Sequence, residues 1–351
     1  MKSIASGVRS SPESPYTTVA QQAEHSLDKR KAAGSSPLAN EKHQVQILNV
    51  EYLTAEDYAD DFHCLKSGTR SIYVKKVNFM PGFTPKTGGL VLDRAFMRSL
   101  SERALPPAAA QAVFAGSGGG TGRGMSSDAG TAAGVPAASK TSTPAAQASA
   151  PAVGAPAAGD FYVTVFSYER DFSAVVNALA RFQEARRQAD ASFRVHALVA
   201  AGKGSAPFFQ AWHKAGKPFP ATALSFMQQQ DWDSLLCAAS FNLVRGEDSL
   251  SRACLAGRPF LWQAYPQEDD YQLVKVQALL SRLKSYLSPE LYCPLERSWI
   301  SYNKAGDADG EALYRLLMQE EALTAAFQAF SQSLIANGNL AEHLLAYLAG
   351  L

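Results

Sequence analysis

Residues 241–249 read FNLVRGEDS, an apolar run followed by a charged stretch with one glycine. The apolar run has the length and composition of a buried strand, and a helical pattern follows it. A helix that opens at such a loop directs free backbone N–H groups and the positive end of its dipole at an anion. The stretch is therefore typical of a phosphate site, with a capped turn and solvated charges as the alternative. We expect Asp248 or Ser249 to cap the helix.

The next residues complete a unit of strand, loop, helix and strand. Residues 251–256 are helical in character, Gly257 ends this helix, and a second strand begins at Pro259 and runs to Gln263. Ligands of open parallel sheets bind beyond the carboxyl ends of the strands. We therefore expect the loops 245–249 and 263–267 to line one crevice.

Short apolar strands and amphipathic helices alternate before this unit, which predicts an α/β fold with a parallel sheet. The predicted strands are 161–168, 193–200, 221–226 and 241–244, and the predicted helices are 172–188, 205–215 and 231–239. The tail is predicted to be helical over 271–287, 311–335 and 340–348.

Composition narrows the class of protein. The 351 residues are 46% hydrophobic with a net charge of +1, so two domains are possible and nucleic acid is not expected as a partner. No apolar run approaches the roughly 20 residues that span a bilayer. We expect a cytoplasmic protein without a membrane partner.

Metal binding is not expected either. The cysteines, Cys64, Cys237, Cys254 and Cys293, are widely spaced, lack a C-x-x-C pair and are interpreted as reduced core thiols. The histidines His63, His196 and His213 have no matched carboxylate in the sequence and are interpreted as core or surface residues.

Four motifs occur in an order that resembles a known family. They are NVEYLTAED at 49–57, PGFTPKTGGL at 81–90, VFSYE at 165–169, and NLVRGEDS at 242–249 together with PFLWQAYPQ at 259–267. The chain resembles the elongation factor P maturation arginine rhamnosyltransferase family. The resemblance implies a two-domain, Rossmann-like glycosyltransferase of the GT-B type that needs no cofactor. It also implies dTDP-β-L-rhamnose as the donor, an arginine of elongation factor P as the acceptor, and inversion at the sugar carbon.

The first residues depart from the family pattern. Members of the family open with a strand and a loop that carries two aspartates, and residues 1–46 contain no such pattern. We therefore expect residues 1–43 to be disordered or non-homologous and residues 44–103 to be a remnant of the N-terminal acceptor domain. Its strand 47–52 is expected to lack its usual partners.

The remaining domains follow from composition and from the resemblance. Residues 104–159 are rich in Ala, Gly, Ser and Pro, which predicts a disordered linker, with a lid as the less favoured interpretation. Residues 160–351 are expected to form the complete nucleotide-sugar-binding domain. Without the aspartates we expect slow or absent transfer. The alternatives are a catalytically dead module that binds a nucleotide sugar or the elongation factor, and an unrelated nucleotide-binding α/β protein.

The resemblance also implies roles for particular residues, and some of these residues have an ordinary structural role as the alternative. One of Phe166 and Tyr168 would stack on the base, where a strand aromatic is otherwise core. Gln229, otherwise a solvated loop residue, would donate to the thymine ring. The diphosphate and sugar would be bound by Arg245, Gly246, Glu247, Asp248 and Ser249.

Glu247 is the candidate catalytic residue. A carboxylate beside phosphates is repelled unless it accepts from hydroxyls or from an arginine, so we expect it to orient the donor rather than to take the proton. Gln263 and Tyr265 are secondary candidates. Lys86 and Thr87 resemble a cleft loop, with a plain surface turn as the alternative.

Overall fold

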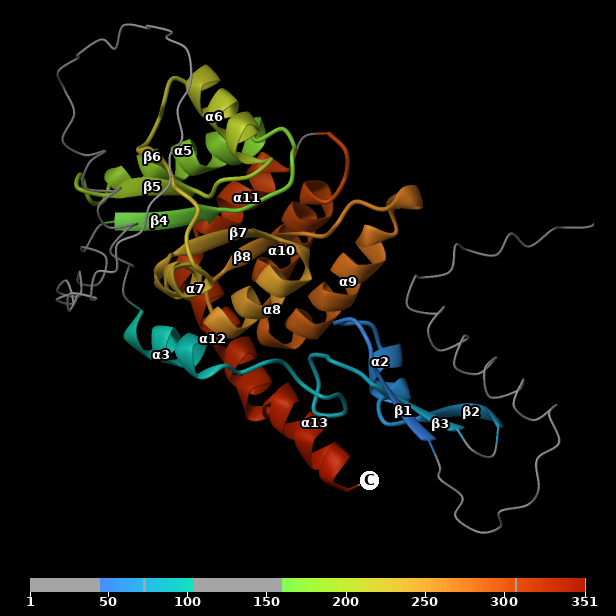
Figure 1. The fold of residues 1–351 in the computed structure, drawn as a ribbon. Helices are drawn as coiled ribbons and strands as arrows, with labels where there is room; N and C mark the ends of the chain where they lie inside the picture. Colours follow the sequence, from blue (N-terminus) through green and yellow to red (C-terminus); the bar gives the residue numbers. More distant parts are fainter. Residues whose placement is uncertain (1–44, 72–73, 104–159, 307, 351) are drawn as a thin grey trace, which may run out of the picture.

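The computed structural model describes residues 45–71, 74–103, 160–306 and 308–350. The segments 1–43 and 104–159, for which disorder is predicted, lie outside the described residues. The larger sheet has five strands in the order β6-β5-β4-β7-β8, and every pair is parallel (Figure 1). The strands are β4 (Asp160–Val165), β5 (Arg194–Val199), β6 (Ala221–Ala223), β7 (Phe241–Arg245) and β8 (Phe260–Gln263).

The strands of this sheet are almost continuously apolar because both faces are covered by helices. Residues 161–165 of β4 are all buried, as are 241–244 of β7. Where polar side chains enter the sheet they pair with each other: the hydroxyl of Thr164 lies 2.6 Å from Oδ1 of Asn242. The Asn242 amide in turn donates to the carbonyl of Leu236 at 3.2 Å. These bonds satisfy groups whose burial would otherwise be costly.

The helices surround the sheet and continue into a C-terminal bundle (Figure 1). They are α5 (Ser173–Arg187), α6 (Ser205–Lys214), α7 (Gln229–Ala238), α8 (Gly246–Ala256), α9 (Gln272–Leu283), α10 (Pro289–Tyr302), α11 (Gly310–Leu317), α12 (Glu320–Ala336) and α13 (Leu340–Ala349), with the short turns η1 (Glu268–Asp270) and η2 (Lys284–Tyr286). Helix α5 packs against α6 and α11, whereas α8 packs against α7 and α12.

The strand order determines where a crevice forms. Within the larger sheet, the first strand along the chain is the central strand β4. Strands β5 and β6 follow on one side of it, and β7 and β8 then follow on the other side. The direction of winding therefore changes between β4 and β7. Loops that leave the carboxyl ends of these two strands diverge, and the space between them is where ligands of this class of sheet bind. The α/β fold class predicted from the sequence is confirmed.

Three helices of the structure differ from the sequence prediction. Helix α8 starts at Gly246, directly after β7, so the prediction that Asp248 or Ser249 caps it is wrong. The predicted helix 311–335 is two helices, α11 and α12, because the chain bends at Met318 and Gln319. Helix α10 was not predicted, although Leu291, Leu295, Trp299 and Tyr302 are buried at helical spacing.

The N-terminal part forms a second, smaller sheet. Its elements are β1 (Val45–Val50), α2 (Tyr58–Phe62), β2 (Lys66–Ser71), β3 (Val74–Phe79) and α3 (Arg94–Glu102), with the strand order β1-β3-β2. Strand β1 is parallel to β3, and β2 is antiparallel to it. Strand β1 was expected to lack its usual partners; it lies at the edge of the sheet and is paired on one side, with β3, which in turn pairs with β2.

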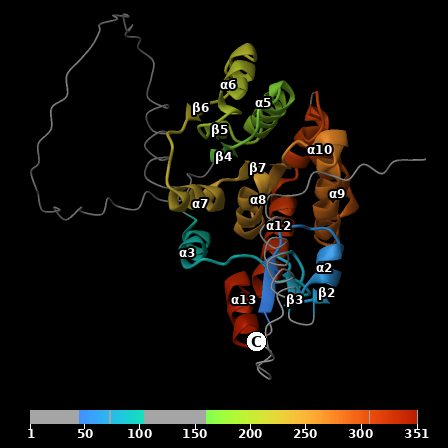
Figure 2. The ribbon, with the colours of Figure 1, turned by 45° about the vertical axis from the view of Figure 1, so that its right-hand side comes forward.

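Contacts with the C-terminal part hold this smaller sheet in place. The backbone N–H of Leu340 donates to the carbonyl of Leu90 at 2.8 Å, and the Asn339 amide bonds both backbone groups of Leu92. On the other side, Arg282 donates to the carbonyl of Ala55 at 2.9 Å. Helix α13 begins at Leu340, and the centroid of its Tyr347 ring lies 6.0 Å from that of the Phe79 ring at the end of β3. Helix α3 packs against α7 and lies beside it in both views (Figure 2).

Two expectations about titratable residues need correction. His196 has a carboxylate partner after all, since its Nε2 lies 3.0 Å from Oδ1 of Asp160. These residues lie diagonally across the β4–β5 pair, in which Asp160 is opposite Arg194 and Tyr162 is opposite His196, and they are 36 positions apart in the chain. Of the cysteines, Cys237 and Cys254 are buried, but Cys64 and Cys293 are exposed, so only the first two are core thiols. Burial raises the pKa of Cys237 to about 12.

Candidate functional site

A cavity of about 320 Å³ opens at the carboxyl ends of the parallel strands. Its walls come from the segments that follow β4, β5 and β6 and from the first turns of α7 and α8, and they are formed by Phe166, Ala200, Ala201, Ser225, Phe226, Met227, Gln228, Gln229, Trp232 and Ser249. Phe166, Gln229 and Ser249 were predicted as site residues from the sequence. The fold therefore brings together three of these residues from three separate segments.

Arg245 stands beside this cavity, at the last position of β7. Its guanidinium carbon lies 4.5 Å from the centroid of the Phe166 ring and 4.6 Å from that of the Tyr168 ring. Tyr168 also meets Tyr265 edge to face, with their centroids 5.7 Å apart. Burial raises the pKa of Tyr168 despite the nearby Arg245 charge, so the phenol is neutral at physiological pH. Two aromatic rings thus fix a permanent cation at the mouth of the crevice.

Gly246 lets the chain turn from β7 straight into α8. Its φ is +69°, a left-handed conformation that favours glycine, and the indole Nε1 of Trp262 donates to its carbonyl at 2.9 Å. No side chain caps the start of α8. The N–H groups of its first turn are thus not occupied by a capping side chain.

Glu247 and Asp248 occupy this first turn, where negative charge is favourable. Asp248 is exposed, whereas Glu247 is half-buried and its Oε1 lies 3.5 Å from Nζ of Lys275 on α9. Glu247 also borders residues 53–55 of the N-terminal part across a narrow gap. The carboxylate therefore lies where the two parts of the chain meet, with a cation beside it.

Gln229 is held by a residue one helical turn later. Its Nε2 donates to Oδ1 of Asp233 at 2.9 Å, and Oδ2 of Asp233 accepts from Arg252 at 2.5 Å. Burial raises the pKa of Asp233, while the Gln229 amide and the Arg252 guanidinium oppose that rise. Nearby, the buried indole Nε1 of Trp232 has no hydrogen-bond partner among the described residues.

Gln263 and Thr87 support loops rather than face the cavity. Gln263 is buried, and its Oε1 accepts from the hydroxyl of Ser167 and, at 2.8 Å, from the backbone N–H of Tyr168. It therefore fixes the loop after β4. Thr87 is buried and donates to the carbonyl of Thr84 at 2.8 Å, while Lys86 is exposed. This geometry is that of a turn.

Sequence reasoning missed four residues around this crevice, Trp232, Asp233, Arg252 and Lys275. Asp233 lies in the predicted helix 231–239, but Gln229, four positions earlier, was placed in the loop before it, so the pairing of these two residues was not predicted. Arg252 reaches Asp233 from the next helix, 19 positions away. Lys275 reaches Glu247 from 28 positions away. Only the packing of α8 between its neighbours brings these pairs together.

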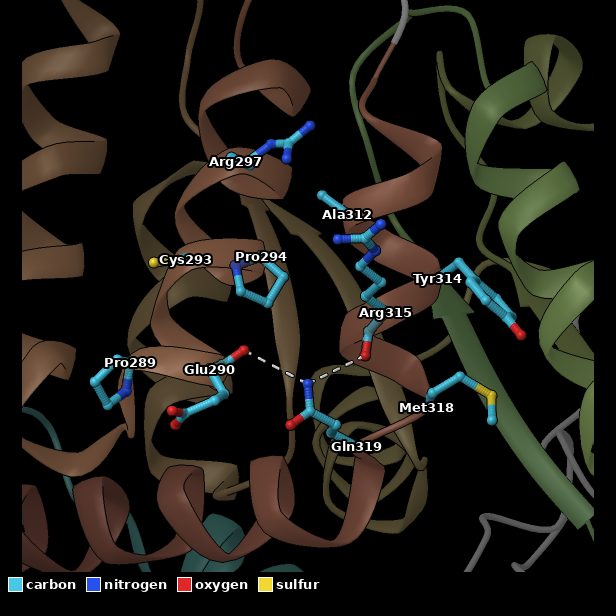
Figure 3. A pocket seen from close by; sticks show the side chains of 10 residues that line it. All are labelled: Pro289, Glu290, Cys293, Pro294, Arg297, Ala312, Tyr314, Arg315, Met318 and Gln319. Atoms are coloured by element: carbon cyan, nitrogen blue, oxygen red, sulfur yellow. Dashed lines mark hydrogen bonds between the residues drawn. The ribbon is translucent and has the colours of Figure 1, made fainter.

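A second cavity, of about 600 Å³, lies between α10 and α11 (Figure 3). Pro294 lacks the N–H that would bond the carbonyl of Glu290, and the amide of Gln319 approaches that carbonyl at 3.5 Å instead. The arginines in its wall already pair with Asp309 and Glu311. No predicted site residue lines this cavity.

Within the described ranges, no three His, Cys, Asp or Glu side chains cluster so that they could hold a metal ion. Among the helices that the structure describes, none combines the length and the apolar character that a bilayer crossing requires.

Comparison with known proteins places the chain in a family. A family model described as elongation factor P (EF-P) rhamnosyltransferase EarP matches residues 34–349. The protein-arginine rhamnosyltransferase of Shewanella oneidensis is 31% identical over 258 residues, which are 70% of this chain and 54% of that protein. The enzyme of the same name from Pseudomonas putida is 29% identical over 257 residues, 73% of this chain and 59% of that protein. The chain thus spans somewhat more than half the length of these relatives.

A solved structure, which concerns EarP-mediated arginine glycosylation of EF-P, has a similar fold. The TM-score is 0.52 at 23% identity, and the match covers 78% of this chain and 75% of that one. At this identity the likeness concerns the fold. It agrees with the two-sheet α/β architecture described above.

Proposed function

The chain belongs to the EarP family of elongation factor P rhamnosyltransferases, and from this membership we propose that it binds dTDP-β-L-rhamnose for transfer of L-rhamnose to an arginine of elongation factor P. The observation that carries the proposal is the position of Arg245, stacked against Phe166 and Tyr168 where β7 turns into α8. A cation, an uncapped helix start and a cavity meet there. A nucleoside diphosphate needs these three features.

The nucleotide occupies the crevice in a defined direction in this proposal. The base lies in the cavity near Phe166 and Gln229, since 320 Å³ is within the usual range of small-molecule sites. The diphosphate lies at the start of α8, where backbone N–H groups, the helix dipole and Arg245 attract negative charge. The hydroxyl of Ser249, which lines the same cavity, is a further donor.

Glu247 orients the sugar in this proposal. A free carboxylate beside a diphosphate would be repelled, but Lys275 at 3.5 Å offsets part of that repulsion. A carboxylate only accepts hydrogen bonds, and the hydroxyls of rhamnose are donors of suitable geometry. Glu247 therefore binds the donor in the first turn of α8 and does not need to act as a base.

The reaction breaks the bond between the anomeric carbon and the phosphate oxygen, and the electron pair leaves with the diphosphate. An arginine nitrogen forms the new bond from the opposite face, which inverts the anomeric carbon, and it gives up one proton to a base. Arg245 and the start of α8 would stabilise the charge that develops on the leaving diphosphate. The residues described here thus serve the donor side of the transfer.

A module that binds the donor without transfer is the second candidate. The carboxylates Asp57 and Asp60 of the N-terminal part lie 3.0 and 3.5 Å from the guanidinium nitrogens of Arg282. Asp60 also accepts from the hydroxyl of Thr84. Both carboxylates are thus engaged with side chains of this chain, which favours binding without transfer.

Mass spectrometry of the acceptor separates the two candidates. The purified chain is incubated with dTDP-rhamnose and unmodified elongation factor P, with a full-length relative as the positive control. A mass increase of one rhamnosyl group supports transfer. An unmodified acceptor together with measurable donor binding supports the binding module, and the absence of donor binding contradicts both.

A further inference from the structure

The amide of Gln229 is fixed at one end and open at the other. Gln229 is the first residue of α7, is exposed and lines the cavity, whereas Asp233 is only 2% exposed. The bond from Nε2 of Gln229 to Oδ1 of Asp233 is 2.9 Å long. The buried carboxylate therefore holds the nitrogen end of an amide that takes part in the cavity wall.

Whether Asp233 is ionised decides which end of the Gln229 amide, nitrogen or oxygen, it can bind. Its other oxygen accepts from Nη1 of Arg252 at 2.5 Å, and the same nitrogen lies 3.4 Å from Oδ2 of Asp93. A guanidinium stays protonated, so it favours the ionised form of Asp233 although burial acts against it. An ionised carboxylate has no proton to donate. Gln229 must therefore turn its NH₂ group toward Asp233.

We propose that Asp233 is a positioning residue that sets base selectivity: it holds the Gln229 carbonyl oxygen toward the cavity, which favours a base with an imide N–H, thymine or uracil, over cytosine. This inference rests on the proposed nucleotide site and extends it. Asp233 itself does not touch the ligand. It acts through Gln229.

The selectivity follows from the edges of the two kinds of base. Thymine and uracil present O4 as an acceptor next to N3–H as a donor, which match the second Nε2 hydrogen and Oε1 of Gln229. Cytosine presents an amino group and an unprotonated N3 at the same places, so both contacts are mismatched. A glutamine free to rotate by half a turn would satisfy cytosine equally well. Asp233 removes that freedom.

The test compares two nucleotides on the full chain. Calorimetry gives the dissociation constants of dTDP and dCDP, and the wild type should bind dCDP at least about tenfold more weakly, because both contacts to the edge of cytosine are mismatched. In Asp233→Asn the new amide can donate or accept, so Gln229 can turn. We expect the ratio of the two constants to fall to within about threefold of unity.

The matched control is Asp93→Asn. It removes the same unit of charge from the surroundings of Arg252 and keeps an acceptor at the start of α3, but Asp93 does not bond Gln229. The ratio should stay at its wild-type value. A purely structural loss in either variant would weaken both nucleotides together and leave the ratio unchanged.

The outcomes are distinct. If Asp233→Asn fails to fold, the double variant Asp233→Asn with Arg252→Gln, which leaves no unpaired buried charge, is measured in its place, and the same loss of ratio is expected. If Asp233→Asn binds dTDP tightly and keeps the wild-type ratio of the dTDP and dCDP dissociation constants, the role of Asp233 is overturned. The proposed function then remains intact. A folded wild-type chain that binds neither nucleotide overturns both.

Discussion

The guanidinium carbon of Arg245 lies over the ring of Phe166, 4.5 Å from its centroid. An aromatic contact, rather than a carboxylate, holds this cation, since no ion pair to Arg245 is found within the part of the chain that the structure describes. Its charge is therefore available to an anion from outside. This arrangement links the end of β7 to the loop after β4, the two places where the winding of the sheet changes direction.

Arg245→Lys should weaken dTDP binding by about tenfold or more. Lysine keeps the charge but loses the planar stacking, worth about 0.5–2 kcal/mol, and the forked geometry that suits a phosphate. Titration calorimetry measures the change. Arg315→Lys is the control: Arg315 is exposed, pairs with Glu311 and lines the second cavity, so this change should leave the affinity for dTDP unchanged. Equal affinities for wild type and Arg245→Lys would show that this cation does not meet the ligand.

Gly246→Ala should cost both stability and affinity. The φ of +69° would strain an alanine by about 1–2 kcal/mol. Gly216→Ala is a matched control, because Gly216 has a φ of +77° with no atom near its added Cβ. Urea unfolding should show similar losses in the two variants, whereas dTDP binding should weaken only in Gly246→Ala. A similar weakening in both would mean that the effect is general destabilisation.

Much of this site could be predicted from residue order alone. The succession of apolar strand, Gly246 and helix, and the left-handed Gly257 that ends α8 with a φ of 63°, depend on local chemistry and appear in the structure. The starting residue of α8 was predicted too late, because a helix can begin directly at a strand end when a glycine takes up the turn.

Other features depend on contacts between distant residues. The pairing of Asp233 with Arg252 and that of Leu90 with Leu340 join segments whose separation carries no periodic signal. The one partner of β1 is β3, which pairs with β2 within the largely polar segment 66–79, where no strand was predicted. Tertiary pairing overrides weak local propensity at such places.

The free energy of unfolding should depend on pH through Asp309, the residue that caps α11. Its Oδ1 accepts from the N–H of Ala312 at 2.9 Å, and its Oδ2 accepts from Arg297 at 2.7 Å. Burial acts to raise the pKa of Asp309, but these bonds outweigh it and the pKa lies below its usual value. A lowered folded-state pKa means that the stabilisation is complete above about pH 4 and is lost as the pH falls through the folded value.

Asp309→Ala should therefore lower the free energy of unfolding by about 1 kcal/mol at pH 7. The difference from wild type should shrink when urea unfolding is repeated near pH 3. Asp309→Asn, which can still cap the helix, should lose less at pH 7. A difference that is the same at both pH values would rule out the ionised cap as its source.

Gly88→Ala should loosen the contact between the small sheet and α13. An added Cβ would lie 2.5 Å from the Phe79 ring and 2.8 Å from a methyl group of Leu340, so one of them must move. Such overpacking costs about 1–3 kcal/mol, and urea unfolding should show it. Gly350→Ala, where the added Cβ meets only ordinary contacts at 3.6 Å and beyond, is the control. If the two variants are equally stable, the contact between the small sheet and α13 does not contribute to the cooperative unfolding of the chain.

Calorimetric titration of the full chain with dTDP tests the central claim most directly, namely that a nucleoside diphosphate binds where β4 and β7 diverge. We expect saturable binding at one site, which Phe166→Ala should weaken by about tenfold or more, because stacking of a base on an aromatic ring is worth about 1–3 kcal/mol. Tyr314→Ala, in the wall of the second cavity, should bind as the wild type does. A folded wild-type chain that gives no saturable heat, or binding that Phe166→Ala leaves intact, would contradict a nucleotide site between β4 and β7.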